Sequence, residues 1–440
     1  MSTPPATRML AEFASTCQLQ DVPDVVVERA KLTVLDTIGV ALAAVEQPIG
    51  AVAAGLARRV PGPCTALGSQ QTADAVSAAV ANGTLANALD FDEGFHLATS
   101  CLPAALAMGE ATDAPGSAVL GAYIVARECG ARLTAAIDGR RREGVGLTAN
   151  GWWHVGVVGP VAACIAAGTL LGLDVPTQQT AIGLATCASG GFRRNMGTMA
   201  KSLHSGLAAG HGVQAALLAQ AGATADGTII EAPLGLAAAA TAGGQPDWAA
   251  LSLLGDPFEL EGHLPLKKYP TCTPLHALLE AYLSLQRDHR FGWRDVAAAY
   301  GDHHRFSLFR DYPADPLEAA FSPGYILAAA LMAGDFGLPQ LGHAVIADDR
   351  VVRLAAKMHD APGSATARIV LNDGEVLDRP LGATPRLTDR AGILEKYRRC
   401  ASGVLPAPLL DTSIEAVLGM EVAPSVREVT RLFAAPQARV

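Results

Sequence analysis

The chain has few aromatic side chains, few charges and very few lysines. Of its 440 residues, 5% are aromatic and 17% are charged, whereas 50% are hydrophobic. An interior with so few rings is built mainly from Ala, Leu, Val and Gly, which suits closely packed helices. A chain of this length exceeds what one hydrophobic core usually serves, so the sequence favours two domains.

Patterns typical of disulfide frameworks, metal sites and nucleic-acid binding are missing. The eight cysteines, at positions 17, 64, 101, 129, 164, 187, 272 and 400, form no C-x-x-C pair and have no histidine at metal-ligand spacing. They are typical of small buried hydrophobes in a reducing compartment. The net charge of -9 and the lack of basic runs argue against nucleic acid and anionic membranes as partners.

Long hydrophobic runs are also scarce. The longest uncharged run, residues 151 to 173, is long enough to cross a bilayer, but it is rich in Gly and Ala and contains His154 and Pro160. We interpret it as a helix buried in a large soluble domain. The first twelve residues include Arg8 and Glu12 and show no apolar segment of a signal peptide, so we expect a cytoplasmic protein.

What the sequence does contain is a succession of helical patterns followed by a change of character. Apolar residues recur at helical spacing over most of the first 290 residues. Short strand patterns then appear at 296–300, 365–371 and 376–380, the last two joined by a hairpin-like Asn-Asp-Gly-Glu. We predict a mainly α fold: a large all-helical domain over 1–265, completed by 405–440, and a smaller α+β lid domain over 266–404.

One predicted helix, within residues 197–212, carries three ionisable side chains among small apolar ones. They are Lys201, His204 and His211. Cations on a buried helix are costly unless an anionic group meets them. The alternative is that Lys201 reaches solvent and both histidines are ordinary core residues.

A second group is acidic. Asp90, Asp92 and Glu93 lie within four residues, shortly before His96. Crowded carboxylates perturb one another's pKa, and a carboxylate beside an imidazole fixes its tautomer, so an acid/base pair is one interpretation. An ordinary acidic helix end with a surface histidine is the other. A metal site is less consistent with the spacing.

Two further stretches complete the candidates. Lys267 and Lys268 precede Tyr269-Pro270 and the predicted helix of His276, and Tyr325 ends a Phe-Ser-Pro-Gly-Tyr segment in the smaller domain. The lysines suit a polar lip between the domains. A capping loop, a packed histidine and a core tyrosine are the corresponding structural alternatives.

Taken together, these stretches resemble the MmgE/PrpD family, which includes 2-methylcitrate dehydratase, cis-aconitate decarboxylase and iminodisuccinate epimerase. The resemblance spans nearly the whole chain. It implies a helical domain with an α+β lid, usually in a homodimer, and a site between the domains that uses no metal or organic cofactor. It rests on Leu35-Asp-Thr-Ile-Gly-Val-Ala-Leu42, residues 82–92, Gly197-Thr-Met-Ala-Lys-Ser-Leu-His-Ser-Gly206, Glu231-Ala-Pro-Leu-Gly235, Lys267-Lys-Tyr-Pro270 with His276, and Phe321-Ser-Pro-Gly-Tyr325.

The resemblance also implies roles for single residues. Carried over by position, the family's site falls on Asp90, Lys201, Lys267 and Tyr325, with the lysines holding substrate carboxylates, and His96 takes the place of a family histidine. Relatives commonly have Gly-Trp-His or Gly-Phe-His before a glycine-containing helix, where this chain reads Gly-Trp-Trp-His. Trp153 therefore stands at the position of a proton-transferring histidine, and His154 lies one position further on.

We expect from these features a cofactor-independent lyase of dehydratase type that acts on a small di- or tricarboxylate by proton abstraction next to a carboxylate. Decarboxylation of a cis-aconitate-like acid and epimerisation of an iminodisuccinate-like acid are the alternatives, followed by a non-catalytic carboxylate binder. Proton abstraction needs a base, and fixed positive charge where the anion develops. The predicted catalytic residues are Asp90, His96, His154, Lys201 and Tyr325, and the predicted substrate-binding residues are Lys201, His204, Lys267, Lys268 and His276.

Overall fold

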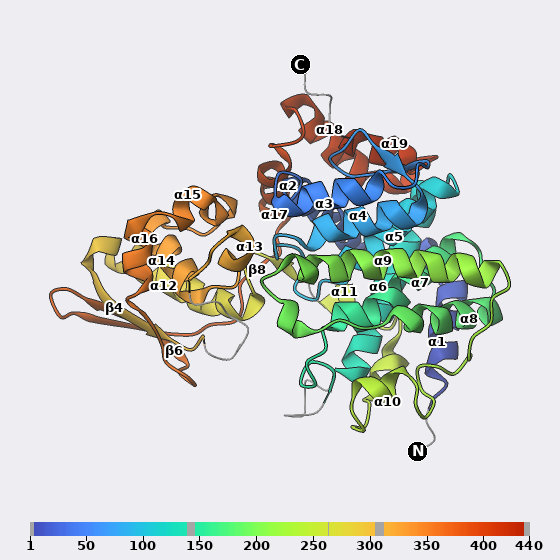
Figure 1. Cartoon of the computed structure of the whole chain (residues 1–440), viewed down its shortest axis with the longest axis horizontal. Coiled ribbons are helices and arrows are strands. Elements are labelled where there is room, and N and C mark those ends of the chain that lie inside the picture. The colour runs from blue at the N-terminus through green and yellow to red at the C-terminus, as the bar shows by residue number, and fades with distance from the viewer. Residues whose placement is uncertain (1–3, 139–145, 263, 304–311, 435–440) are drawn as a thin grey trace.

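The computed structural model describes residues 4–138, 146–262, 264–303 and 312–434. Figure 1 shows a large helical unit and a smaller unit of helices and strands beside it. The predicted mainly α fold with two domains is confirmed. The helices of the large unit before residue 265 are α1 (Ala6–Thr16), α2 (Asp24–Ala43), α3 (Pro48–Ala57), α4 (Ala75–Asn87), α5 (Ala98–Ala111), α6 (Gly116–Ile137), α7 (His154–Leu170), α8 (Val175–Ala185), α9 (Met199–Gln220), α10 (Leu236–Ala240) and α11 (Glu259–Gly262).

Small residues let the central helices of the large unit pack closely. Helix α9 crosses the front of this unit, against α4 and α7 (Figure 1). Where α9 meets α4, a Cβ added to Gly206 would lie 2.3 Å from the Val80 carbonyl oxygen and 2.1 Å from the Thr84 hydroxyl, so only glycine fits. The Gly- and Ala-rich composition is thus what brings the polar end of α9 up to the end of α4.

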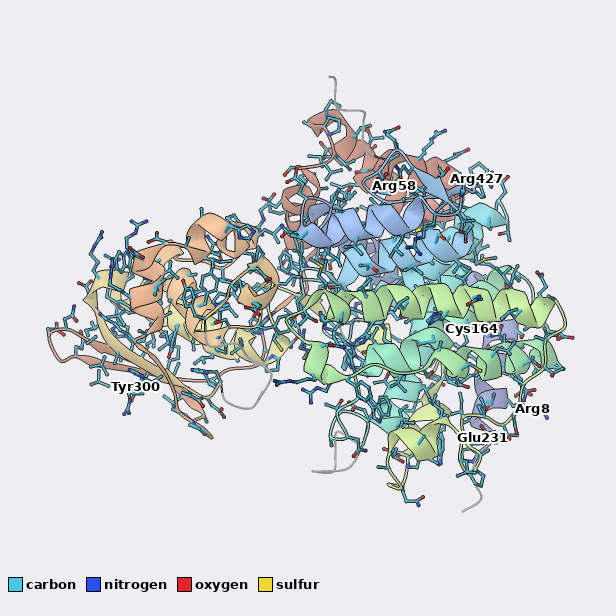
Figure 2. The ribbon with its side chains drawn as sticks, in the orientation of Figure 1. Arg8, Arg58, Cys164, Glu231, Tyr300 and Arg427 are labelled. Atoms are coloured by element: carbon cyan, nitrogen blue, oxygen red, sulfur yellow. The ribbon has the colours of Figure 1, made fainter. Side chains whose placement is uncertain are left out.

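Helix α7 contains most of the long uncharged run. It has 17 residues, with Pro160 inside, and it is almost entirely buried; Cys164, on this helix, lies inside the large unit in Figure 2. Among the described residues no single helix is long and apolar enough to cross a membrane. Only α2 and α3 together, meeting at 104°, pass that test of length and composition.

The smaller unit has its own core beneath a four-stranded sheet. The strand order is β5-β4-β6-β7, with β4 and β5 parallel and the other pairs antiparallel. The predicted strands and the hairpin at 372–375 are confirmed, and Tyr300 marks the strand β4 in Figure 2. The elements are α12 (His276–His289), β4 (Val296–Gly301), α13 (Pro316–Ala319), α14 (Pro323–Ala333), α15 (His343–Ile346), α16 (Asp349–Ala355), β5 (Met358–Asp360), β6 (Thr366–Leu371) and β7 (Val376–Pro380).

Two short strand pairs and the C-terminal helices complete the fold. Strand β3 (Leu266–Lys267) pairs with β8 (Arg386–Leu387), and a separate pair, β1 (Cys64–Thr65) with β2 (Thr72–Ala73), lies in the large unit. Helix α17 (Arg390–Ala401) packs on α2, and its buried residues belong to the core of the large unit. The chain therefore rejoins the helical core at α17, earlier than the residue 405 expected from the sequence; α18 (Ala407–Leu418) and α19 (Arg427–Thr430) follow.

Candidate functional site

The acidic stretch forms a buried loop between α4 and α5. Asp90, Asp92 and Glu93 are each at most 2% exposed, and His96 is 8% exposed. Asp90 and His96 have left-handed backbones, with φ of 49° and 58°. Such conformations are costly for residues other than glycine and persist where surrounding contacts enforce them. The alternative of a surface-exposed acidic helix end does not apply.

Asp90 lies between two buried lysines from distant parts of the chain. Lys201, in the first turn of α9, donates to Asp90 Oδ1, and Lys267 Nζ lies 2.8 Å from Asp90 Oδ2 and 2.9 Å from the Asp90 carbonyl oxygen. Burial alone would raise the pKa of Asp90, but the two ammonium groups and His96 outweigh it and hold that pKa well below its ordinary value. For Lys201, burial is the largest effect and lowers the pKa.

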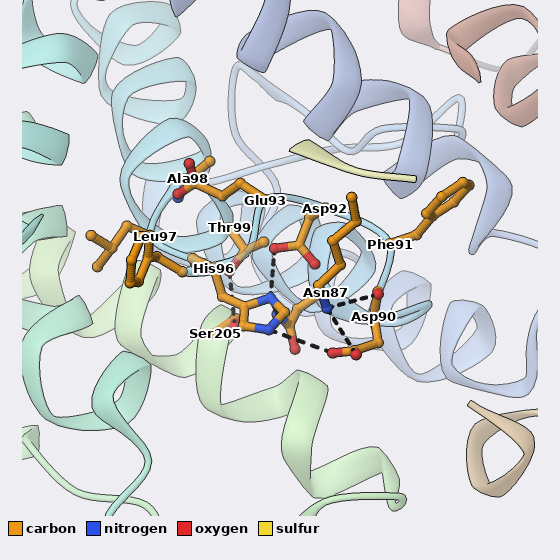
Figure 3. A network of polar contacts seen from close by, with 12 residues as sticks. Asn87, Asp90, Phe91, Asp92, Glu93, His96, Leu97, Ala98, Thr99 and Ser205 are labelled. Atoms are coloured by element: carbon orange, nitrogen blue, oxygen red, sulfur yellow. Dashed lines mark hydrogen bonds and ion pairs between the residues drawn. The ribbon is translucent and has the colours of Figure 1, made fainter. Parts of the chain in front are cut away.

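His96 is held in one tautomer by the neighbouring carboxylate. Its Nδ1 lies 2.7 Å from Asp92 Oδ2, and its Nε2 lies 3.5 Å from Asp90 Oδ1; Figure 3 shows the ring between the two carboxylates. Asp92 therefore accepts the Nδ1 proton, and the Nε2 lone pair faces the Asp90 side. The carboxylate that orients His96 is Asp92.

The protonation of His96 should reflect this environment. Burial is the largest effect on the pKa of His96, and it lowers that pKa below 6.5 despite the opposing effect of Asp92. The resting protein keeps His96 neutral down to lower pH than an exposed histidine, so we expect the ring to take up its proton only below pH 6.5. An NMR titration of the His96 ring measures this, and protonation of the ring at or above pH 6.5 would contradict it.

Asp90, Asp92, His96, Lys201 and Lys267 together form what we call the Asp90 cluster. Trp153 packs beside it. The Lys201 ammonium lies 4.8 Å from the centre of the Trp153 ring, and the His96 ring is 5.7 Å away. Trp153 is 1% exposed, and its indole N–H has no hydrogen-bond partner among the residues that the structure describes. His204 meets the same indole edge-on at 6.1 Å, and burial, then Lys201, lowers its pKa.

His154 also comes close to His96, from the first residue of α7. Its Nε2 is 2.7 Å from the Phe95 carbonyl oxygen, and its ring centre is 6.4 Å from that of His96. Both Trp153 and His154 thus border the site, with the tryptophan ring adjacent to Lys201.

Three other predicted residues form polar contacts outside the Asp90 cluster. Lys268 is partly exposed and pairs with Glu280 at 2.7 Å. The Tyr325 hydroxyl donates to the Gln340 carbonyl oxygen within the smaller unit. His276 is buried, with Nε2 3.2 Å from the Thr271 carbonyl oxygen, and burial followed by the charge of Lys267 lowers its pKa to about 3. The substrate-binding roles of Lys268 and His276 and the catalytic role of Tyr325 remain predictions.

Residues that the sequence did not single out brace the site. Arg127 forms two hydrogen bonds to Glu93, at 2.7 and 3.0 Å, and a third to Glu259 at 2.6 Å. Arg386, opposite Lys267 in the β3–β8 ladder, stacks over Gly94, and burial lowers its pKa. Arg127 had one signal in the sequence, a charged residue in an apolar run, but such a signal does not identify its partner; Arg386 lies in a polar stretch that gave no signal.

Cavities and metal-type clusters do not locate the site. Cavities of about 640 and 1180 Å³ lie along α3 and α4 and beside α1 and α6, and share no lining residue with the Asp90 cluster. Over the described ranges, no three His, Cys, Asp or Glu side chains are grouped so as to hold a metal ion. We place the candidate site where charged side chains converge. They come from three parts of the chain: Asp90 from the loop that follows α4, Lys201 from α9, and Lys267 from β3.

Comparisons with known proteins identify the family of the chain. The chain is 28% identical to a cis-aconitate decarboxylase of Aspergillus terreus, with 98% of this chain and 96% of the relative aligned. It is 25% identical to the human cis-aconitate decarboxylase, over 82% of this chain and 79% of the relative. The family model for the MmgE/PrpD N-terminal domain matches residues 8–249, and the model for the C-terminal domain matches residues 269–420. The chain therefore belongs to the MmgE/PrpD family.

Proposed function

We propose that the chain is a cofactor-independent lyase that decarboxylates a small unsaturated tricarboxylate of the cis-aconitate type. The observation that carries the proposal is the buried Asp90–Lys201–Lys267 cluster beside the His96–Asp92 pair. The names of the relatives support decarboxylation ahead of the dehydration that the sequence favoured. Family membership alone would leave the reaction open, because one fold serves several chemistries.

The two lysines supply fixed positive charge for the substrate. A tricarboxylate brings three negative charges. Of its three donors, Lys201 gives one to Asp90 and Lys267 gives two, so each ammonium has at least one further donor. A buried ammonium attracts a carboxylate more strongly than an exposed one, because the surroundings screen it less. Lys201 and Lys267 therefore bind substrate carboxylates, while Asp90 keeps both ammonium groups in place.

Decarboxylation moves one electron pair along the substrate and needs one proton. The bond between the leaving carboxylate and its methylene carbon breaks, carbon dioxide departs, and that electron pair forms a new double bond. The former double bond's pair moves onto the carbon next to a second carboxylate, and the ammonium groups stabilise the resulting anion. A bound trianion raises the pKa of His96, so the imidazole takes up a proton and delivers it to that carbon.

Dehydration is the second candidate, and the resting state of His96 favours it. A neutral imidazole with its Nε2 lone pair free of the Asp92 hydrogen bond is ready to remove a proton next to a carboxylate. Loss of hydroxide from the adjacent carbon would then give the unsaturated acid. Epimerisation shares the first step and returns the proton to the other face.

Proton NMR in deuterated buffer tests the proposal with cis-aconitate, 2-methylcitrate, citrate and iminodisuccinate. Decarboxylation predicts a five-carbon product with new vinylidene signals, one deuterium at a methylene carbon and release of carbon dioxide. Vinyl signals without carbon dioxide would favour dehydration, and deuterium uptake without net loss would favour epimerisation. Thermal stabilisation by these acids without turnover would leave only a carboxylate-binding protein. A Lys201→Met preparation controls for contaminating enzymes.

The homodimer implied by the resemblance also remains a proposal. Three leucines of α9, Leu207, Leu217 and Leu218, are 37 to 46% exposed. Leucines of this exposure on a helix that crosses the front of the large unit support a partner surface there (Figure 1).

A further inference from the structure

Asp36, in the Leu-Asp-Thr-Ile-Gly stretch of α2, forms a buried ion pair with Lys396, which lies far away in the sequence. Its Oδ1 lies 2.7 Å from Lys396 Nζ, and both side chains are at most 1% exposed. Neither residue touches the Asp90 carboxylate, and the proposed reaction gives neither a task. A buried ion pair is weak evidence for stability, since its desolvation offsets much of the attraction, so its presence needs another reason.

Lys396 connects α17 to the two segments that carry the site. Its ammonium donates to the Phe91 carbonyl oxygen at 2.5 Å and to the Lys267 carbonyl oxygen at 3.1 Å, besides pairing with Asp36. It also lies 3.9 Å from the centre of the Phe91 ring. Two of the three donors of the Lys396 ammonium have backbone carbonyl acceptors, and the Asp36 carboxylate balances its charge as an ion pair. One side chain thus fixes the backbone at Lys267 and at the residue after Asp90.

Asp36 can reach Lys396 because α2 and α17 pack closely together. A Cβ added to Gly39 would lie 2.9 Å from Tyr397 Cδ2 and 3.4 Å from Tyr397 Cα, so glycine is needed for the helices to approach. Gly39 lies one turn after Asp36, and Tyr397 is next to Lys396. Asp36 and Gly39 therefore act together: both allow α17 to pack on α2 with Lys396 directed toward the site.

We propose that Lys396, held by Asp36, is a positioning residue for the catalytic cluster. Asp90 adopts a left-handed backbone that only tertiary contacts maintain, and the Phe91 carbonyl is the next backbone acceptor along the chain. Releasing that carbonyl and the Lys267 carbonyl lets Asp90 and Lys267 move relative to Lys201. A shift of about 1 Å in such a cluster costs about 10²-fold in rate.

The test separates positioning from simple stabilisation with variants on the same helix. Lys396→Met removes the ammonium, and the double variant Asp36→Asn with Lys396→Met leaves no unpaired buried charge and should keep the fold. Tyr397→Phe is the matched control, because it removes a buried hydrogen bond of 2.6 Å to Ser413 that does not reach the site. Hydrogen exchange is measured on peptides covering 88–97 and 264–268, normalised to a peptide of α7.

We expect exchange in both site peptides to speed up at least about 10-fold in Lys396→Met and in the double variant, and to stay unchanged in Tyr397→Phe. We also expect kcat to fall about 10²-fold with KM changed less than about threefold. Normal exchange in the site peptides of the folded double variant would overturn the inference. The exchange result needs no substrate, so it decides the inference even if the wild-type protein fails the decarboxylation test, which bears only on the proposed function.

Discussion

Replacing Lys201 with methionine is expected to lower kcat about 10³-fold and to leave the fold intact. The ammonium is 3% exposed and donates to Asp90, so the variant loses fixed positive charge where the substrate anion develops. Removing one preorganised donor from such a site costs about 10²–10³ in kcat. The fold should survive because Asp90 keeps Lys267 at 2.8 Å and methionine fills most of the lysine volume. Steady-state kinetics and circular dichroism measure both outcomes.

Lys357→Met provides the matched control for this experiment. Lys357 is another partly buried lysine, but its Nζ donates to the Val296 carbonyl oxygen in the smaller unit, 2.6 Å away. Its loss should leave kcat within about twofold of the wild type. A Lys201→Met protein with near-normal turnover would remove Lys201 from the catalytic machinery and with it the proposed site.

The sequence predicted the elements that depend on local pattern. Helical spacing predicted the succession of helices over most of the first 290 residues, and the Asn-Asp-Gly-Glu hairpin with its flanking strand patterns predicted β6 and β7. The resemblance also aligned Asp90, Lys201 and Lys267, which the structure brings together, while their roles toward a substrate stay predictions. The predicted helices and strands were confirmed where a short period determines the structure.

Partner choice was less predictable, and the two adjacent lysines show why. Successive side chains of an extended segment point to opposite sides, so Lys267 enters the cluster while Lys268 reaches Glu280 near the surface. The sequence grouped them as two substrate-binding cations. Likewise, the spacing of Asp90 and Asp92 before His96 did not show that the left-handed turn at Asp90 directs Asp92, and not Asp90, to Nδ1.

Contacts between distant segments were beyond sequence reasoning altogether. Asp36 and Lys396 are 360 positions apart, and neither lies in a pattern that points to the other. The motif around Asp36 contributed to the resemblance without a physical explanation. The structure supplies one, since Gly39 permits the helix contact and Asp36 neutralises the lysine that the contact brings in.

Replacing Asp90 with asparagine is expected to reduce both stability and activity, because two buried ammonium groups lose their shared counter-charge. Breaking a buried ion pair from one side costs about 3–5 kcal/mol, and asparagine tolerates the left-handed backbone, so the loss reflects charge and not strain. Urea unfolding at pH 7 measures it. The matched control is Asp378→Asn, which breaks an exposed pair with Arg368 and should cost less than about 1 kcal/mol.

The free energy of unfolding at acidic pH provides a second test of the charge on Asp90. The pKa of Asp90 is held well below its ordinary value of 3.8, so its stabilising contribution is present above that pH and is lost as the pH falls through the folded-state pKa. The stability difference between wild type and Asp90→Asn should therefore be constant near neutrality and begin to narrow below about pH 3.8. A difference that is small at pH 7, or that widens in acid, would mean that Asp90 does not hold the two lysines as a charged carboxylate. The lysines would then need another anion, and the substrate itself would be the first candidate.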